Sequence, residues 1–458
     1  MNQTEKKIAF VPFGEINSPR ELIAQMAAAA LEEVKGLGYA VVSTDLVTDD
    51  EAGTDVARAL HDLDGQSFDA LIVCLTGWIP SHAVISITDP HRQVPMVLWG
   101  LAGKRTNGHI VTTAAQAGTS ALRKVFADLG YRFTYLYNII DNPSPLEKID
   151  SFIQAAFAQK ALRSTKIGMV GFRDMRLYNT LYEGVSLKSK LGIEVEFVEM
   201  LEVVKASERV EASAVTAVLN TIQTAWNFQG TVDRQFLEQG IAYYLAIRKI
   251  ALEKGLDAIS LKDVDGMKKL LSYPPAVVFM LLADEAGLCT IPENDVMGAV
   301  TQLIVKQLTG QSAAYLEFYE YFEDSVLMGV PDYVPAEVVQ ERVNVLPAAF
   351  GQISGGLLNV SSMREGRLTI ARLSNTGTAY TMHIATGEGH LCSWEEAGWT
   401  QPAPQLPSLL IKLDTKTEQF VQQISGQHYI LAYGDCTSLL VDFCRLNDIE
   451  IILHHAAN

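Results

Sequence analysis

The chain has 458 residues, of which 48% are hydrophobic and 19% are charged. This composition is typical of a globular protein, and the length predicts two or three domains. The formal net charge of −17 argues against a partner such as nucleic acid or an anionic membrane surface, because both repel an acidic protein.

The N-terminal residues lead directly into an apolar, strand-like segment at residues 8–13, without the apolar region of a signal peptide. No apolar run approaches the roughly 20 residues that span a bilayer. The five cysteines are odd in number and show no CxxC spacing, which favours reduced thiols. We therefore expect a cytoplasmic protein.

Residues 1–160 alternate between short apolar runs and amphipathic stretches. This pattern predicts a parallel sheet with helices on both faces, so we assign the segment to an N-terminal Rossmann-like α/β domain. The predicted strands are residues 8–13, 39–44, 70–75 and 95–99, and the predicted helices are residues 20–35, 56–63 and 113–129.

Residues 161–330 predict a second α/β domain. It begins with a strand at Lys166 that ends in Gly171. The apolar run at residues 276–283 is compatible with a strand or with a buried helix. The other predicted elements are strands at 192–198 and 315–328 and helices at 175–190, 213–225, 237–254 and 295–308.

Residues 331–458 differ from the rest of the chain in composition and pattern, because glycine, serine and threonine become frequent and predicted strands follow one another at short spacing. Such a pattern is typical of an antiparallel sheet or a small barrel. The chain is predicted to close as helix, strand, helix and strand at residues 419–424, 429–433, 436–446 and 450–453. The overall prediction is an α/β protein with two Rossmann-like domains and a β-rich C-terminal domain.

Three segments each hold one side chain of a metal-binding type: Glu293 in Ile-Pro-Glu-Asn-Asp, Glu317 in Tyr-Leu-Glu-Phe-Tyr, and His428 in Gly-Gln-His-Tyr. Two carboxylates and an imidazole would form an open site for a divalent cation, with positions left for water or sugar oxygens. In their order and surroundings, these segments resemble the metal-binding segments of the L-fucose/L-arabinose isomerase superfamily, and the order of the predicted domains is similar too.

This resemblance implies a manganese-dependent aldose–ketose isomerase. In it, Glu293, Glu317 and His428 would bind Mn²⁺ or another divalent cation, and the two glutamates would move a proton between C1 and C2 through an enediol. The chemistry is consistent, because a carboxylate can transfer the proton while the cation stabilises negative charge on O1 and O2. The imidazole nitrogen favours Mn²⁺ over Mg²⁺.

Each of these residues also has a purely structural interpretation. Glu293 precedes a predicted helix that Asp295 could cap. Glu317 shares its strand with Glu320 and could belong to a solvated sheet face. His428 is flanked by apolar residues and could be a histidine of the core.

Val330 departs from the family pattern. It follows glycine in Leu-Met-Gly-Val-Pro, where arabinose-isomerase-type proteins commonly carry a further histidine ligand. This departure is compatible with a three-ligand site of the fucose-isomerase type. It also leaves open a protein of this fold that has lost its activity.

A second contact region is Gly-Phe-Arg-Asp-Met-Arg, which follows the strand beginning at Lys166. The family has a small, neutral turn facing the sugar here, whereas this chain has Arg173, Met175 and Arg176. A guanidinium can hold a sulfonate or phosphate through paired hydrogen bonds. We therefore expect an anionic aldose such as sulfoquinovose, or otherwise a sugar of the L-fucose or L-arabinose type. Alternatively, the arginines are surface residues that pair with Asp174.

Trp78 and Trp394 lie in predicted loops, where an indole could stack on a sugar ring or simply pack. The resemblance further implies a homo-oligomer, a trimer or hexamer, with active sites at subunit interfaces. His82, Asn107 and Gln116 could then act from a neighbouring subunit.

The main alternative is a non-catalytic sugar-binding or regulatory protein, because two Rossmann-like lobes also describe periplasmic-type binding proteins. The expected absence of a signal peptide, the lack of a helix-turn-helix segment and the three conjoined ligand residues count against it.

Overall fold

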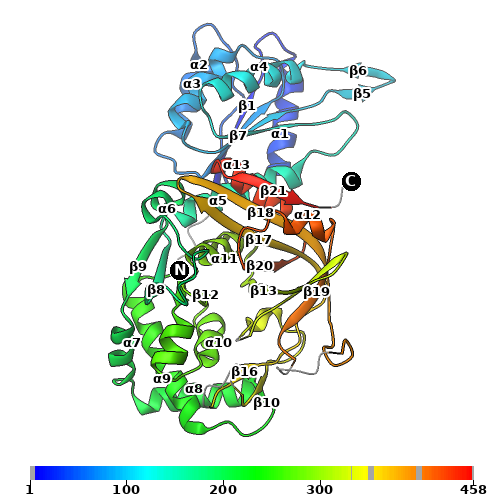
Figure 1. Ribbon diagram of the computed structural model, residues 1–458. Helices are drawn as coiled ribbons and strands as arrows, with labels where there is room; N and C mark the ends of the chain where they lie inside the picture. Colours follow the sequence, from blue (N-terminus) through cyan, green and yellow to red (C-terminus); the bar gives the residue numbers. More distant parts are fainter. Residues whose placement is uncertain (1–5, 332, 349–354, 399–404, 456–458) are drawn as a thin grey trace. The chain divides into compact units, whose positions relative to one another are not determined.

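The computed structural model describes residues 6–331, 333–348, 355–398 and 405–455. The chain divides into two compact units, Met1–Lys160 and Ala161–Asn458, whose elements are drawn in Figure 1. Across the described residues, we find no helix with the length and apolar character that a membrane crossing needs.

The first unit is built on a parallel sheet. Its described strands are β1 (Lys7–Phe13), β2 (Ala40–Ser43), β3 (Ala70–Leu75), β4 (Met96–Gly100) and β7 (Phe133–Tyr137), in the order β2-β1-β3-β4-β7. The central strands β3 and β4 are buried along their whole length, which is why they appear as unbroken apolar runs in the sequence. The edge strand β7 was not predicted from the sequence.

The helices of the first unit connect these strands. They are α1 (Arg20–Lys35), α2 (Thr54–Leu63), α3 (Ser81–Thr88) and α4 (Ala115–Asp128), with a short 3-10 turn at Asp89–His91 and a hairpin of β5 (Lys104–Thr106) and β6 (His109–Val111). The predicted helices at 20–35, 56–63 and 113–129 match α1, α2 and α4 to within two residues. Helix α5 (Leu146–Leu162) then leads into the second unit.

The second unit contains another parallel sheet. Its strands are β8 (Lys166–Val170), β9 (Glu194–Val198), β11 (Ala258–Leu261) and β12 (Cys289–Ile291), in the order β12-β11-β8-β9. Around it lie α6 (Gly184–Leu191), α7 (Met200–Ser207), α8 (Ala212–Ala225), α9 (Arg234–Lys254), a π-helix (Asp263–Leu270) and α10 (Ala276–Asp284). The ambiguous run at 276–283 is thus a helix, and its apolar character on every side reflects burial of nearly all its residues.

Six described strands of the second unit close into a barrel (Figure 1). They are β13 (Ala314–Tyr321), β14 (Ser325–Gly329), β17 (Gly366–Thr376), β18 (Ala379–His390), β19 (Ser408–Leu413) and β20 (His428–Tyr433). All neighbours are antiparallel in the order β17-β20-β13-β14-β19-β18, and β17 pairs with β18 to complete the closure.

Smaller elements complete the second unit. Strand β21 (Glu450–His454) joins β18 in parallel. A separate small sheet holds β10 (Asn227–Phe228), β15 (Asn344–Leu346) and β16 (Leu358–Asn359), and the remaining helices are a 3-10 turn (Ala336–Val338), α12 (Thr417–Val421) and α13 (Thr437–Leu446).

The chain is therefore a mixed α/β protein with parallel sheets and a closed β-barrel. The barrel takes β13 and β14 from the region assigned to the second α/β domain, and one apolar core extends from Val170 to Leu431 through both parts. The division into three domains and the Rossmann-like character of the two layers remain predictions.

Two sequence expectations are corrected. The helix expected at 175–190 begins only at Gly184, because Met175 and Arg176 have φ angles of 43° and 56°, which an α-helix does not contain. The alternating segment at 315–328 is a hairpin of β13 and β14 rather than one strand.

Helix α11 (Val296–Thr309) joins the two parts of the second unit. It packs against β11 and β12 of the parallel sheet and against β17 and β20 of the barrel. Most of its residues are buried. The turn that precedes α11 is therefore held between the parallel sheet and the barrel.

His383 on β18 predicts a pH dependence of stability. The residue is fully buried, its Nδ1 lies 2.5 Å from the Tyr429 hydroxyl, and Phe420 stacks on its ring. Burial, with the nearby His454, lowers the pKa of His383 to about 3. The folded protein therefore keeps this imidazole neutral at a pH at which the unfolded chain, with a pKa of about 6.5, takes up a proton.

The contribution of His383 to stability is thus fully present above pH ~6.5 and is lost as the pH falls towards 3. Between pH 7.5 and 5 the loss should be ~2 kcal/mol. Urea unfolding measures the free energy of unfolding at both pH values. Its decrease from pH 7.5 to pH 5 should be smaller by this amount in His383→Gln than in the wild type. Equal drops in both proteins would contradict the assignment.

Candidate active site

Glu293 lies in a tight turn between β12 and α11. Glu293 and Asn294 have φ angles of 63° and 52°, a conformation that costs a residue with a side chain roughly 1 kcal/mol or more. The buried side-chain amide of Asn294 donates to the carbonyls of Val170 (3.0 Å) and Ser260 (3.2 Å). The backbone amide of Glu293 donates to Asp263 Oδ1 (2.8 Å). These bonds fix the turn at the carboxyl ends of β8 and β11.

Glu317 and His428 face each other across two barrel strands. They are paired residues in the antiparallel register of β13 and β20, so their side chains share one face. His428 Nε2 lies 3.6 Å from Glu317 Oε2. Gln427 Nε2 donates to the same Glu317 oxygen at 2.9 Å.

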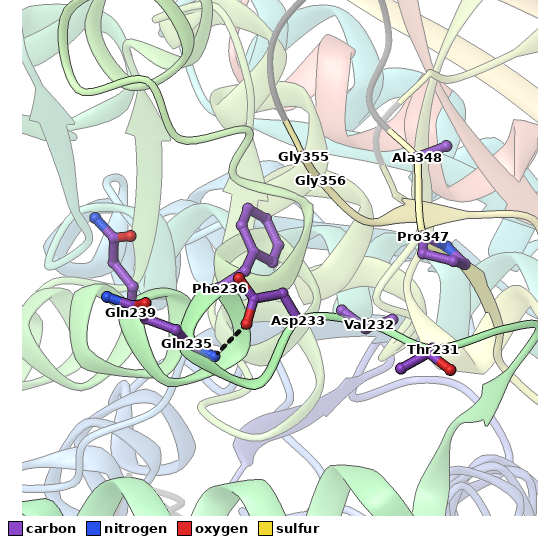
Figure 2. A pocket seen from close by; sticks show the side chains of 10 residues that line it. All are labelled: Thr231, Val232, Asp233, Gln235, Phe236, Gln239, Pro347, Ala348, Gly355 and Gly356. Atoms are coloured by element: carbon purple, nitrogen blue, oxygen red, sulfur yellow. Dashed lines mark hydrogen bonds between the residues drawn. The ribbon is translucent and has the colours of Figure 1, made fainter.

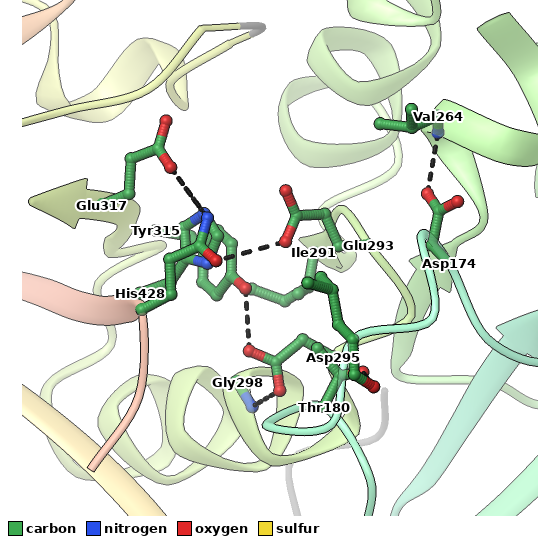
Figure 3. A network of polar contacts seen from close by, with 12 residues as sticks. Asp174, Thr180, Val264, Ile291, Glu293, Asp295, Gly298, Tyr315, Glu317 and His428 are labelled. Atoms are coloured by element: carbon green, nitrogen blue, oxygen red, sulfur yellow. Dashed lines mark hydrogen bonds and ion pairs between the residues drawn. The ribbon is translucent and has the colours of Figure 1, made fainter. Parts of the chain in front are cut away.

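The third member of the cluster approaches the other edge of the imidazole. Glu293 Oε2 lies 3.7 Å from His428 Nδ1, so the ring sits between two carboxylates (Figure 3). The side chains of His428, Glu293 and Glu317 are 4%, 14% and 21% exposed. The structure thus brings together the three residues predicted as metal ligands, and Glu317 is the most open to solvent.

The cluster carries an excess of buried carboxylates. Burial raises the pKa of Glu293 to about 9, and the surrounding carboxylates, led by Asp263 and Glu317, add to the increase. Burial lowers the pKa of His428 to about 3. Glu293 Oε2 accepts no hydrogen bond from any described residue. A cation beside Glu293 would relieve both the repulsion and the missing contact.

The types of donor fit a divalent cation, since two carboxylates and an imidazole suit a borderline metal such as Mn²⁺. As the side chains lie here, however, His428 turns a different nitrogen towards each glutamate. No group of three or more histidine, cysteine, aspartate or glutamate residues in the described chain is spaced to hold an ion. A shared ion therefore requires at least one of the two carboxylate side chains to rotate.

The His428 ring is held by residues that were not predicted as site residues from the sequence. Tyr315 stacks on it with centroids 4.3 Å apart and planes 13° apart. The Tyr315 hydroxyl donates to Asp295 Oδ2 (2.7 Å), and Asp295 Oδ1 accepts from the Gly298 amide (2.9 Å). Asp295 therefore caps α11, as the structural interpretation suggested, and also anchors the aromatic ring behind the imidazole.

Arg372 on β17 completes this support. Its guanidinium binds both carboxylate oxygens of Asp295, with Nη2 donating to Oδ1 at 2.9 Å, and both side chains are 1% exposed. Although burial opposes a charge here, Arg372 holds the pKa of Asp295 below its ordinary value. The available sequence signal was an arginine within the apolar run Ile-Ala-Arg-Leu, where a charge is rare unless it is paired.

Asp174 does not pair with the neighbouring arginines. Its carboxylate is fully buried and accepts hydrogen bonds from the amides of Val264 (2.7 Å), Asp265 (2.7 Å) and Met175 (3.0 Å). It thereby ties the segment after β8 to the first turn of the π-helix. The alternative in which surface arginines pair with Asp174 is not what the structure shows.

The two arginines have different surroundings. Arg173 is half-buried and donates through Nε to the Leu177 carbonyl (2.8 Å) and through Nη2 to the Arg176 carbonyl. Its guanidinium also lies 4.5 Å from the ring centroid of Tyr178. Arg176 is exposed. Met175, between them, is half-buried, and its amide also donates to Asp265 Oδ2 (2.9 Å).

The remaining predicted residues lie in other settings. Trp394 packs with Leu358 and Leu406, and its indole nitrogen donates to Ser408 Oγ (3.2 Å). Val330 is buried in the apolar core. The residues assigned to the first unit are Trp78, which is 39% exposed, and His82, Asn107 and Gln116. Their role as sugar contacts remains a prediction.

A cavity of about 570 Å³ lies at the start of α9 (Figure 2). Its lining includes Asp233, Phe236 and Gln239 but none of the predicted site residues. Asp233 accepts a hydrogen bond from the Gln235 amide (2.9 Å) and so caps α9. Because catalysis needs convergent titratable groups, we place the candidate site at Glu293, Glu317 and His428 instead.

Comparison with known proteins finds three similar relatives with one shared name. The chain is 20% identical over 455 residues to proteins named sulfoquinovose isomerase from Priestia aryabhattai and Priestia megaterium, covering 97% of this chain and 98% of each relative. A sulfoquinovose isomerase from Alkalicoccus urumqiensis is 18% identical over 368 residues, which cover 79% of this chain and 80% of the relative.

Neither the family models nor the solved structure described next indicates a family for this chain. No family model matches the chain. A periplasmic solute-binding protein of an ABC transporter from Actinobacillus succinogenes, with bound D-allose, is 14% identical and covers 67% of this chain and 93% of its own, but its TM-score of 0.17 carries no argument. The likeness to the L-fucose/L-arabinose isomerase superfamily therefore remains a resemblance based on motifs.

The buried ion pair behind His428 gives a prediction on stability. Arg372→Met should destabilise the protein by ~3–5 kcal/mol, because it leaves the Asp295 carboxylate buried without a countercharge. The double variant Arg372→Met/Asp295→Asn should recover part of this loss, since asparagine still caps α11. Chemical denaturation of the three proteins measures both effects, and a double variant less stable than Arg372→Met would contradict this explanation.

Proposed function

We propose that the chain is an aldose–ketose isomerase and that its substrate is a sulfonated aldose of the sulfoquinovose type. The observation that carries the proposal is the approach of Glu293 and Glu317 to opposite edges of the buried His428 ring. The named relatives, which match almost the full length, support the same activity and substrate.

In the reaction, C2 of the aldose loses a proton while O1 gains one, which gives an enediol; C1 then gains a proton while O2 loses one, which gives the ketose. Such a step needs a positioned carboxyl group that can take up and return the proton. We assign this acid–base role to Glu293 and Glu317. Glu293 is largely shielded from water, whereas Glu317 is more exposed, so the two carboxyl groups differ in environment as an acid–base pair requires.

We also propose that Glu293, Glu317 and His428 hold a divalent cation, Mn²⁺ by preference. Two observations support this metal site. Two carboxylates and one imidazole suit such a cation, and Oε2 of the buried Glu293 accepts no hydrogen bond from the described residues. When bound, the cation would supply positive charge that stabilises the negative charge developing on the sugar oxygens.

The activity itself is tested with sugars in D₂O. Sulfoquinovose and neutral aldoses are incubated with the metal-replete protein, and NMR follows ketose formation and exchange of the C2 proton. Ketose formation from sulfoquinovose is the expected result. Sugar binding without exchange for any aldose would instead indicate a non-catalytic sugar-binding protein.

Glu293→Gln should keep the fold but lower the rate by about 10²–10⁴-fold, the usual contribution of a general acid–base group. Glu320→Gln is the matched control, because Glu320 is exposed on the same strand as Glu317 and its loss should leave the rate unchanged. A Glu293→Gln protein within tenfold of the wild type would assign the proton transfer to another group.

Metal content provides a separate prediction. Elemental analysis of the protein dialysed against Mn²⁺ should find about one ion per chain in the wild type and little in His428→Ala or Glu317→Ala, because each change removes one of the three donors. Glu320→Gln again serves as the control. Full occupancy in both alanine variants would contradict the ligand assignment.

We further propose a cytoplasmic homo-oligomer, a trimer or hexamer. All five cysteines are free thiols, which suits a reducing compartment. The oligomer rests on the motif resemblance and on the general tendency of enzymes to form closed symmetric assemblies. Light scattering at micromolar concentration should give a multiple of the 50.2 kDa chain mass, and a monomeric mass would refute the assembly.

A further inference from the structure

The segment after β8, residues 171–177, lies at the same edge of the parallel sheet as Glu293; we call it the arginine loop. Both follow the carboxyl ends of parallel strands, where ligands of such sheets collect. Hydrogen bonds link them through the π-helix: Asp174 accepts from the Asp265 amide, and Asp263 accepts from the Glu293 amide. The loop and the turn that carries Glu293 are therefore fixed to one support.

Within the arginine loop, Arg173 is already engaged by the protein. Its Nε and Nη2 donate to the carbonyls of Leu177 and Arg176, and its guanidinium covers the ring of Tyr178. These contacts close the loop on itself. A substrate anion would have to compete with two backbone acceptors for the same donors, so Arg173 is poorly suited to bind one.

Arg176 has the opposite character. It is exposed, and its guanidinium makes no hydrogen bond or ion pair with the described residues. Its carbonyl, however, is held by Arg173. Both Met175 and Arg176 adopt positive φ angles, a conformation that residues with side chains keep only where neighbours enforce it. The backbone of Arg176 is thus fixed while its five N–H donors remain available.

The charge around the arginine loop differs from that of the whole chain. Lys262 packs its side chain over Gly171, where an added Cβ would lie 2.7 Å from the lysine Cβ. Cations outnumber carboxylates in this region, which holds Arg173, Arg176, Lys262, Lys268 and Lys269 against Asp174, Asp263 and Asp265. Lys269 pairs with Asp265 at 2.8 Å, and backbone amides satisfy Asp174. Positive charge at this place, in a chain of net charge −17, favours an anion locally.

We infer that Arg176 binds the sulfonate of the substrate and that Arg173 is a positioning residue that holds the loop in shape. This inference rests on the proposed function and specifies which residue selects the anionic sugar. A sulfonate presents three oxygen acceptors, and a guanidinium can donate two parallel N–H bonds to them. A sugar that lacks the sulfonate gains nothing from these bonds.

The effect of Arg176 should therefore depend on the charge of the substrate. A hydrogen bond to a charged group contributes enough for Arg176→Ala to lower kcat/KM for sulfoquinovose by roughly 10- to 150-fold. The loss should appear mainly in KM, because the sulfonate lies far from C1 and C2 and is held equally in the ground state and the transition state.

The experiment compares sulfoquinovose with 6-deoxy-D-glucose, the same sugar without the sulfonate. Arg176→Ala should lose activity on sulfoquinovose while changing less than about threefold on the neutral sugar, and Arg176→Lys should restore part of the loss, because lysine keeps the charge without the paired donors. Arg173→Ala should lower kcat/KM for both sugars by similar factors and should change kcat. Arg209→Ala, which removes an exposed arginine after α7, is the control and should match the wild type.

Three results would overturn the inference. Arg176→Ala could stay within threefold of the wild type on sulfoquinovose, it could lose activity equally on both sugars, or Arg173→Ala alone could show the charge-selective rise in KM. A wild type that turns over neutral aldoses but not sulfoquinovose is a separate outcome: it refutes the proposed substrate and, with it, the role of Arg176 as a sulfonate contact.

Discussion

The ion pair between Arg372 and Asp295 is the interaction on which the rest of the candidate site depends. It joins residues 77 positions apart, one on a barrel strand and one at the start of α11. The same carboxylate caps the helix and accepts from Tyr315, whose ring supports His428. One buried group therefore sets the position of the helix, the aromatic ring and the imidazole together, and only paired charges are tolerated at this depth.

The other acidic residues near the site show how the protein tolerates several carboxylates in one place. Asp174 and Asp263 accept hydrogen bonds from backbone amides, so their negative charge is shared with fixed dipoles. Glu293 has no comparable donor on Oε2 among the described residues. Local structure thus satisfies two of the three carboxylates, and the third, Glu293, is the one to which we assign the acid–base role.

The sequence predicted the elements whose residues are buried on a regular pattern. The fully buried β3 and β4 and the amphipathic α1 and α4 carry their signal locally. The prediction of a helix at 175–190 was wrong because the buried Asp174 carboxylate holds the following backbone outside the helical range of φ angles. Glu293, Glu317 and His428 were predicted as site residues from the order of the three motifs that hold them, not from their spacing in the sequence. The supporting residues Tyr315 and Arg372 were not identified. An arginine within an apolar run indicates a buried charged partner, but no local pattern shows which distant residue that partner is.

The register of β13 and β20 has a consequence for how such a site can change over evolution. Glu317 and His428 are opposite residues in a closed barrel, where slipping one strand by a single position would turn its side chains to the other face. Insertions and deletions in these strands are therefore strongly restricted. The arginine loop lies outside any strand, so no strand register limits it. The loop that we propose to bind the sulfonate can thus diversify while the strands that carry Glu317 and His428 stay constant.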